Sequence, residues 1–76
     1  MSELKDKEYY KEFGKRVRAL RKERGLTQLE LSALSDLEKS AIQRIERGYN
    51  STIKTLRKLA DAFEISISEM FNYDEG

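Results

Sequence analysis

Residues 26–48 contain two short helical patterns separated by a turn, and this arrangement constrains the fold more than any other part of the chain. Thr27 can accept a hydrogen bond from a free backbone amide, and Glu30 stands where a capping-box partner would reach back. We therefore expect the first helix to begin at Gln28. Two of its apolar residues are expected to share one face: Leu31 and Leu34.

The second pattern follows after about four residues, 34–37, which is the length of a tight turn between helices that cross at a steep angle. Ile42 and Ile45 lie three residues apart and are expected to face the core. Gly48 stands where a left-handed residue would end the helix. The second helix is thus expected over about residues 38–47.

Several residues of this stretch stand in one register: Leu26-Thr27-Gln28, Leu31-Ser32, Leu37, Ser40, Ile42 and Arg44-Ile45-Glu46-Arg47-Gly48. In these residues the chain resembles the phage-repressor-like family of DNA-binding domains, the Cro and cI (Xre) type that also occurs in small bacterial regulators. The resemblance extends from about Phe13 to about Phe71. It implies a compact all-α fold of five helices, like that of the lambda repressor, with a helix-turn-helix.

Two positions depart from the family's pattern. Asp36 stands in the turn where the family usually has Gly, and Glu38 replaces a small hydroxyl residue at the cap. Asp tolerates the left-handed conformation better than most residues other than Gly, so we expect the tight turn to persist. Ser35 and Glu38 also fit a capping box, which leaves the start of the second helix open by a residue or two.

Three further helices are expected outside this stretch. One spans about residues 8–24, and another spans residues 53–63 with Thr52 as its cap. A short last helix is expected after Ser66, with Glu69 as its capping-box partner. The inward face of the first helix should carry Tyr10, Phe13, Val17 and Leu20.

The length of 76 residues predicts a single domain over residues 1–76. Residues 1–7 are expected to be disordered, and residues 72–76 form an acidic tail. The absence of Cys and His excludes disulfides, zinc fingers and thiol or imidazole nucleophiles. Neither a metal nor a cofactor nor a small-molecule ligand is indicated, and catalysis by paired carboxylates is a weak alternative. Without a signal peptide or a membrane span, the expected location is the cytoplasm.

The net charge is only +1, but the charges are unevenly distributed. Residues 1–26 carry nine Lys or Arg against five acids, whereas residues 51–76 carry three against five. Such a chain can turn a basic end toward phosphate and an acidic end away from it. Lys15 and Arg18 read more readily as solvent-exposed charges than as phosphate contacts.

If Ile42 and Ile45 point inward, the outer arc of the second helix is left to polar and charged residues. We expect four of them to contact bases: Lys39, Ser40, Gln43 and Arg44. Arg and Lys can donate to guanine, and Gln can pair with adenine. The resemblance implies base contacts for Lys39, Ser40 and Arg44, with Gln43 beside them.

A second set of residues is expected at the DNA backbone, because a helix N-terminus offers free amides and a positive dipole. Gln28 should clamp phosphate there, although it is also simply a good first-turn residue. For the loop after Gly48, turn chemistry is the competing explanation. The candidate phosphate contacts are Thr27, Gln28, Arg47, Tyr49, Asn50 and Thr52.

The resemblance also implies a largely buried ion pair between Arg21 and Glu46, which would lock the second helix of the motif to the first helix of the chain. In small members of the family the last helix often forms a dimer interface. The residues there are either core or interface, and the candidate interface residues are Ile67, Met70, Phe71 and Tyr73.

These features predict a regulator of transcription that binds double-stranded DNA in the major groove as a homodimer. A repressor acting on a near-palindromic operator is the expected form. The alternative is a protein-interaction module, such as an antitoxin that binds a toxin. In that case Tyr9, Tyr10, Leu29 and the last helix would carry the contact.

Overall fold

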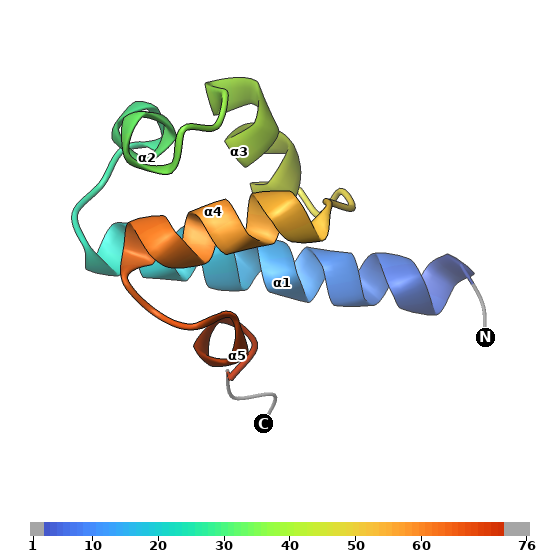
Figure 1. Ribbon diagram of the computed structural model, residues 1–76. Coiled ribbons are helices and arrows are strands. Elements are labelled where there is room, and N and C mark those ends of the chain that lie inside the picture. Colours follow the sequence, from blue (N-terminus) through green and yellow to red (C-terminus); the bar gives the residue numbers. More distant parts are fainter. Residues whose placement is uncertain (1–2, 73–76) are drawn as a thin grey trace.

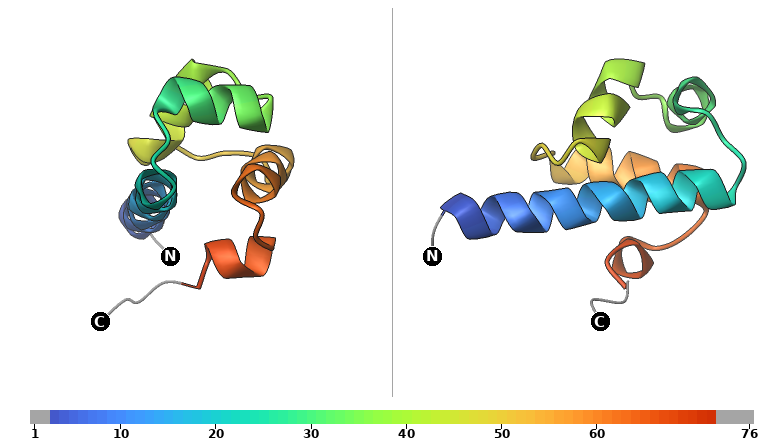
Figure 2. Two further views of the ribbon diagram at one scale, coloured as in Figure 1. Left: turned by 90° about the vertical axis from the view of Figure 1, so that its left-hand side faces the viewer. Right: turned by 180° about the vertical axis from the view of Figure 1, so that it is seen from behind.

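The structure, a computed structural model, describes residues 3–72 and folds them into five helices (Figure 1). Helices α1 (Glu3–Glu23) and α4 (Ile53–Phe63) run along the molecule. Helices α2 (Gln28–Ser35) and α3 (Lys39–Glu46) lie on one side of them, and α5 (Ile67–Met70) lies on the other (Figure 2). All regular secondary structure within the described residues is helical, which confirms the all-α fold. No helix in this range is both long and apolar enough to cross a membrane.

Helix α1 begins at Glu3 rather than at about Glu8, so the prediction of disorder is wrong for residues 3–7. This segment is rich in residues that favour helix, and lengthening an existing helix costs much less than nucleating a new one. The extension of α1 does not depend on burial, because Lys5, Asp6 and Lys7 are all exposed. The predictions for residues 1–2 and 73–76 lie outside the described residues.

Side chains cap the starts of three helices, at the residues that the sequence indicated. At α2, the Thr27 hydroxyl accepts from the Glu30 amide at 3.0 Å, and the Glu30 carboxylate accepts from the Thr27 amide at 2.8 Å. Ser66 and Glu69 form the same capping box at α5. The Thr52 hydroxyl caps α4. The starts of these helices are therefore determined by local hydrogen bonds.

The turn between α2 and α3 is formed differently. Asp36 adopts a left-handed conformation with φ of 59°, as expected for a residue standing in place of Gly. Glu38 occupies the N-cap of α3 but makes no side-chain cap bond with the described residues. Ser35 does not cap α3 either, because it is buried at the end of α2 and donates to the Leu31 carbonyl oxygen at 2.7 Å. The start of α3 at Lys39 thus lacks the capping box.

The core collects apolar residues from all five helices. Leu31 is fully buried, but Leu34 is 59% exposed, so the expectation that they share a face is wrong. Ser35, one turn after Leu31, continues the inner row instead. The inward face expected for α1 is confirmed for Phe13, Val17 and Leu20, whereas Tyr10 is half-buried and is not among the residues that pack against the core. The buried apolar residues are Val17, Leu20, Leu31, Ile42, Ile45, Leu59, Ala60, Phe63 and Met70.

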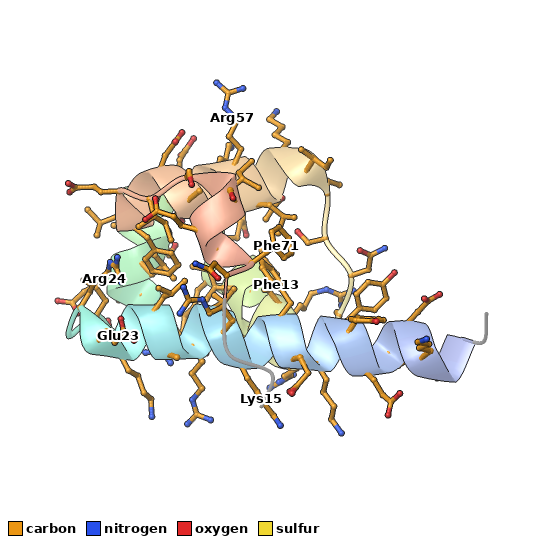
Figure 3. All side chains as sticks on the ribbon, turned by 90° about the horizontal axis from the view of Figure 1, so that it is seen from below. Phe13, Lys15, Glu23, Arg24, Arg57 and Phe71 are labelled. Carbon is orange, nitrogen blue, oxygen red and sulfur yellow. The ribbon has the colours of Figure 1, made fainter. Side chains whose placement is uncertain are left out.

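Met70 is fully buried, so its assignment to a dimer interface is wrong and it belongs to the core. Arg16 fixes the end of α5 there, donating to the carbonyl oxygens of Met70 at 3.2 Å and of Glu69 at 3.0 Å. Phe71 is 49% exposed and stacks on Phe13 with the ring centroids 4.9 Å apart (Figure 3). Only the outer side of Phe71 is thus available to a partner.

Candidate nucleic-acid interface

Helix α3 has one buried face and one polar face. Ile42 and Ile45 are 0% and 2% exposed and anchor the helix in the core. Apart from Ala41, the remaining positions carry side chains that can donate or accept hydrogen bonds. Lys39, Ser40, Arg44 and Arg47 are exposed, and Gln43 is half-buried. The outer arc therefore consists of the residues that the sequence indicated as base and phosphate contacts.

Arg44 and Tyr49 lie against each other at the end of α3. The chain turns at Gly48, whose φ is 99°, and the Tyr49 amide then donates to the Arg44 carbonyl oxygen at 3.0 Å. Together with the Gly48 amide bonded to Ile45, these bonds form a Schellman motif. The guanidinium of Arg44 lies 4.7 Å from the centroid of the Tyr49 ring. This contact restricts the orientations that Arg44 can take.

A largely buried ion pair joins α3 to α1. Arg21 donates to the Glu46 carboxylate through Nε at 2.7 Å and through Nη2 at 3.1 Å, in the bidentate geometry that favours such pairs. Arg21 also donates to the Leu26 carbonyl oxygen at 2.8 Å. The hydrogen bond to Glu46 raises the pKa of Arg21 further, although burial opposes this, so Arg21 remains charged.

Gln28 belongs to the same network, because its amide nitrogen donates to the Glu46 carboxylate at 3.1 Å. The Gln28 side chain, the start of α2 and the body of α3 are thereby held in one arrangement. Since Thr27 and Glu30 cap each other, the first-turn amides that lack an intrahelical acceptor are those of Gln28 and Leu29. An anion placed at the start of α2 would meet these amides and the positive end of the helix dipole.

An open hollow of about 760 Å³ lies between α1, α2 and α3, and we call it the α2 hollow. Thr27, Gln28, Lys39, Gln43 and Arg47 line it, so the fold brings together residues assigned separately to bases and to phosphates. Two cations from α1 also line it, and the sequence reasoning did not select them: Arg18 and Lys22. Glu46 is the one acid in this lining within the described residues, and it is already paired with Arg21.

In the loop before α4, two side chains accept hydrogen bonds from nearby backbone amides, as side chains commonly do in turns and helix caps. The Asn50 side-chain oxygen accepts from the Ser51 amide at 2.7 Å, and the Thr52 hydroxyl accepts from the Thr55 amide at 3.2 Å. Both Asn50 and Thr52 are nevertheless exposed, in the segment that joins α3 to α4. The turn hydrogen bonds that were the competing explanation for Asn50 and Thr52 are thus present. A phosphate contact by these two residues stays a prediction.

Helix α5, which begins at the candidate interface residue Ile67, lies on the other side of the molecule from α2 and α3 (Figure 1). Ile67 is half-buried against the core, and Phe71 lines an apolar hollow of about 230 Å³ together with Phe13 and Leu56. Tyr73 lies outside the described residues. No group of three or more acids within residues 3–72 is arranged to hold a metal ion.

Two short helices that cross after a tight turn, with the second exposing side chains that are able to hydrogen-bond to base edges, define a helix-turn-helix protein. Residues 17–70 match the helix-turn-helix family model, and the chain belongs to this family of DNA-binding regulators. The recognised resemblance to phage-repressor-like proteins is thereby confirmed.

The chain is 43% identical over 56 residues to the immunity repressor protein of Bacillus phage phi105, covering 72% of this chain and 39% of that protein. It is 41% identical over 63 residues to the HTH-type transcriptional regulator PuuR of Escherichia coli strain K12, covering 82% and 34%. The chain thus spans little more than a third of the length of these relatives. The crystal structure of the restriction-modification controller protein C.AhdI from Aeromonas hydrophila superposes with a TM-score of 0.79 at 40% identity, covering 82% of this chain and 96% of that one.

Proposed function

We propose that this protein binds double-stranded DNA as a homodimer, inserts α3 into the major groove and represses transcription at a near-palindromic operator. The observation that carries the proposal is the outer face of α3, where Lys39, Ser40 and Arg44 are exposed while the ion pair of Arg21 and Glu46 fixes the helix. A helix held in place with exposed donors can discriminate base edges, because little backbone ordering remains to occur on binding.

The α2 hollow supports a backbone contact next to this helix. Gln28 and the free amides of α2 would take one phosphate, and Arg47 would take another near the end of α3. These contacts would position α3 and carry no sequence information. Among the similar proteins, one is named an immunity repressor and another a restriction-modification controller, which supports a regulatory role.

Dimerisation is proposed because one copy offers few base contacts, each worth about 1–3 kcal/mol of discrimination. Two copies related by a two-fold axis would read two half-sites about 10 base pairs apart, centre to centre. Ile67 is half-buried and Phe71 is exposed, so their outer sides are available for this contact. Phe71→Asp should give a folded monomer, whereas Met70→Asp should unfold the chain. Sedimentation and circular dichroism distinguish these outcomes, and a wild-type monomer at high micromolar concentration would contradict the dimer.

The proposal is tested by selecting bound sequences from random-sequence duplex DNA at low salt. Wild-type protein should enrich a near-palindrome. Arg44→Ala should weaken binding to it by about 1–3 kcal/mol and relax the preference at one base pair of each half-site. Gln28→Ala should weaken binding to all DNA sequences nearly alike and leave the base preference unchanged. If no sequence is enriched, or if Arg44→Ala leaves every preference intact, the proposed recognition face is wrong.

A further inference from the structure

A row of positive side chains runs along α1. Lys7, Lys11, Arg18 and Lys22 are separated by intervals of four, seven and four residues, which places them on one face of the helix. All four are exposed. The N-terminal half of this row precedes residue 17, where the match to the family model begins. Lys7 and Lys11 are therefore not part of the shared helix-turn-helix.

The end of α3 meets α1 in the middle of this row. A Cβ atom added to Gly14 would lie 3.0 Å from the Glu46 carbonyl oxygen, and one added to Gly48 would lie 3.1 Å from the Lys11 Cα atom. Gly14 stands between Lys11 and Arg18 in the chain, on the same side of α1. The row therefore passes the C-terminal end of α3, with two cations before the contact and two after it.

Each pair of cations lines its own hollow beside α3. Arg18 and Lys22 line the α2 hollow. Lys7 and Lys11 line an open hollow of about 590 Å³ at the start of the α3–α4 loop, which we call the loop hollow. Arg47, at the end of α3, lines both hollows. Of the described residues, none with a carboxylate lines the loop hollow.

We propose that this row forms a second phosphate-binding edge, in which Lys7 and Lys11 contact DNA phosphates that flank those bound at the α2 hollow. The inference rests on the proposed DNA binding. Fifteen residues of helix separate the two ends of the row, a distance of about 22 Å, or about six nucleotides along the duplex axis. An exposed lysine usually only faces solvent. Lys7 and Lys11 differ because Arg47, a predicted phosphate contact, shares their hollow.

The salt dependence of binding tests this proposal. On the duplex enriched by wild-type protein, the slope of log K against log salt should become less steep by about 0.9 for Lys7→Gln, by about 0.9 for Lys11→Gln and by about 1.8 for both together. The base preference should not change, because phosphate contacts carry no sequence information. Circular dichroism should also be unchanged, since both side chains are exposed.

Arg57→Gln is the matched control. Arg57 is exposed on α4 and points away from α1 (Figure 3), so this variant loses one positive charge without losing a member of the row. Its slope should equal that of the wild type. If both Arg57→Gln and Lys11→Gln make the slope less steep by the same amount, the effect reflects total charge and the proposed edge is wrong. If neither variant changes the slope, Lys11 does not contact phosphate and the proposed edge is also wrong.

Trimming the duplex separates this inference from the proposed function. Removing the phosphates outside the enriched site should abolish the difference between wild type and Lys7→Gln/Lys11→Gln, whereas Arg44→Ala should still weaken binding. If the double variant binds the long duplex like the wild type while Arg44→Ala binds it more weakly, the proposed flanking edge is wrong. The proposal that α3 reads the bases is then unaffected. If wild type binds no duplex at all, both proposals fail.

Discussion

The guanidinium of Arg44 and the ring of Tyr49 form a cation–π contact, with 4.7 Å between the Arg44 Cζ atom and the ring centroid. The contact depends on the turn at Gly48, because the left-handed residue folds Tyr49 back onto the last turn of α3. The residue that we expect to read a base is thus held by a residue of the loop. We therefore expect Tyr49 to act on recognition by positioning Arg44.

Tyr49→Ala should weaken binding to the preferred site by about 0.5–1 kcal/mol and relax the same base pair as Arg44→Ala, because the guanidinium loses its support. Tyr49→Phe keeps the ring and should bind like the wild type. Binding titrations on the preferred duplex and on one altered at that base pair measure both effects. If Tyr49→Phe is as weak as Tyr49→Ala, the hydroxyl rather than the ring is important, as expected for a phosphate contact.

Arg21 and Glu46 should be strongly coupled in stability. Removing either partner by Ala leaves a buried charge unpaired and should lower the free energy of unfolding by about 3 kcal/mol or more. The double variant should cost less than the sum of the single changes, because neither charge is then left behind. Urea unfolding of the four proteins gives the coupling, and additive losses would mean that the two charges are separately solvated.

The pair of Glu12 and Lys15 is the control for this cycle. Their side chains are 56% and 73% exposed, and the charged atoms lie 3.4 Å apart. An exposed pair at this helical spacing contributes only about 0.2–0.5 kcal/mol. Glu12→Ala should therefore change the stability by less than about 0.5 kcal/mol, which ties the large effect at Arg21 to burial and bidentate geometry.

Glu64→Gly should stabilise the fold. Glu64 ends α4 in the left-handed conformation with φ of 60°, which is unfavourable for a residue with a Cβ atom by about 1–2 kcal/mol. Part of the gain is lost to the greater backbone freedom of Gly in the unfolded chain, so the net effect should be about 0.5–1 kcal/mol. The midpoint of urea unfolding should rise accordingly. A decrease would mean that Glu64 does not hold this conformation in solution.

Asp36→Gly is the comparison for Glu64→Gly. Asp tolerates the left-handed conformation better than Glu, and Asp36 also pairs with Lys58 at 3.7 Å. The gain at Asp36 should therefore be smaller than the gain at Glu64. Equal gains would show that the side chains have no influence on the strain at these two turns.

The parts of the fold that depend on local hydrogen bonds could be predicted from the sequence. Thr27 and Thr52 identify the first residues of α2 and α4, because a capping hydroxyl acts within three residues of its own position. The start of α1 at Glu3 is missed because no apolar pattern marks it, and Lys5, Asp6 and Lys7 are helical although they are exposed. Met70 could not be assigned from the sequence, because an apolar residue in a single turn of helix fits a core and an interface equally well.

The positively charged residues of α1 show a second limit of prediction from the sequence. Arg18 and Lys22 stand on the polar side of an amphipathic helix, and that pattern is the same for a solvated face and for a binding face. The distinction comes from the packing of α3 against α1, which brings these cations beside Gln28 and Arg47. This packing depends on residues distant in sequence, so no local pattern carries it. One residue of α1, Gly14, does reflect the packing directly.

Gly14→Ala tests how closely α1 and α3 must approach. By helix propensity alone, Ala should stabilise the interior of α1 by about 1 kcal/mol. However, its Cβ atom would collide with the Ile45 carbonyl oxygen and lie 3.0 Å from that of Glu46. Both are backbone atoms of α3, and α3 cannot retreat without straining the bonds between Arg21 and Glu46. Overpacking of this kind costs about 1–3 kcal/mol, so the clash should win and the variant should be destabilised.

The same clash should also displace α3, and this separates Gly14→Ala from a mere loss of stability. Gly25→Ala is the control, because no atom lies within 4 Å of its added Cβ and its cost comes only from the left-handed φ of 67°. Both variants should unfold at lower urea concentration than the wild type. At a temperature where both are fully folded, only Gly14→Ala should change the base preference, since only there do Arg44 and Lys39 shift relative to the α2 hollow. Gly25 lines that hollow, so Gly25→Ala can change the affinity for phosphate but should leave the preference intact. If Gly14→Ala is instead more stable by about 1 kcal/mol, propensity has outweighed packing, and the close approach at Gly14 does not position α3.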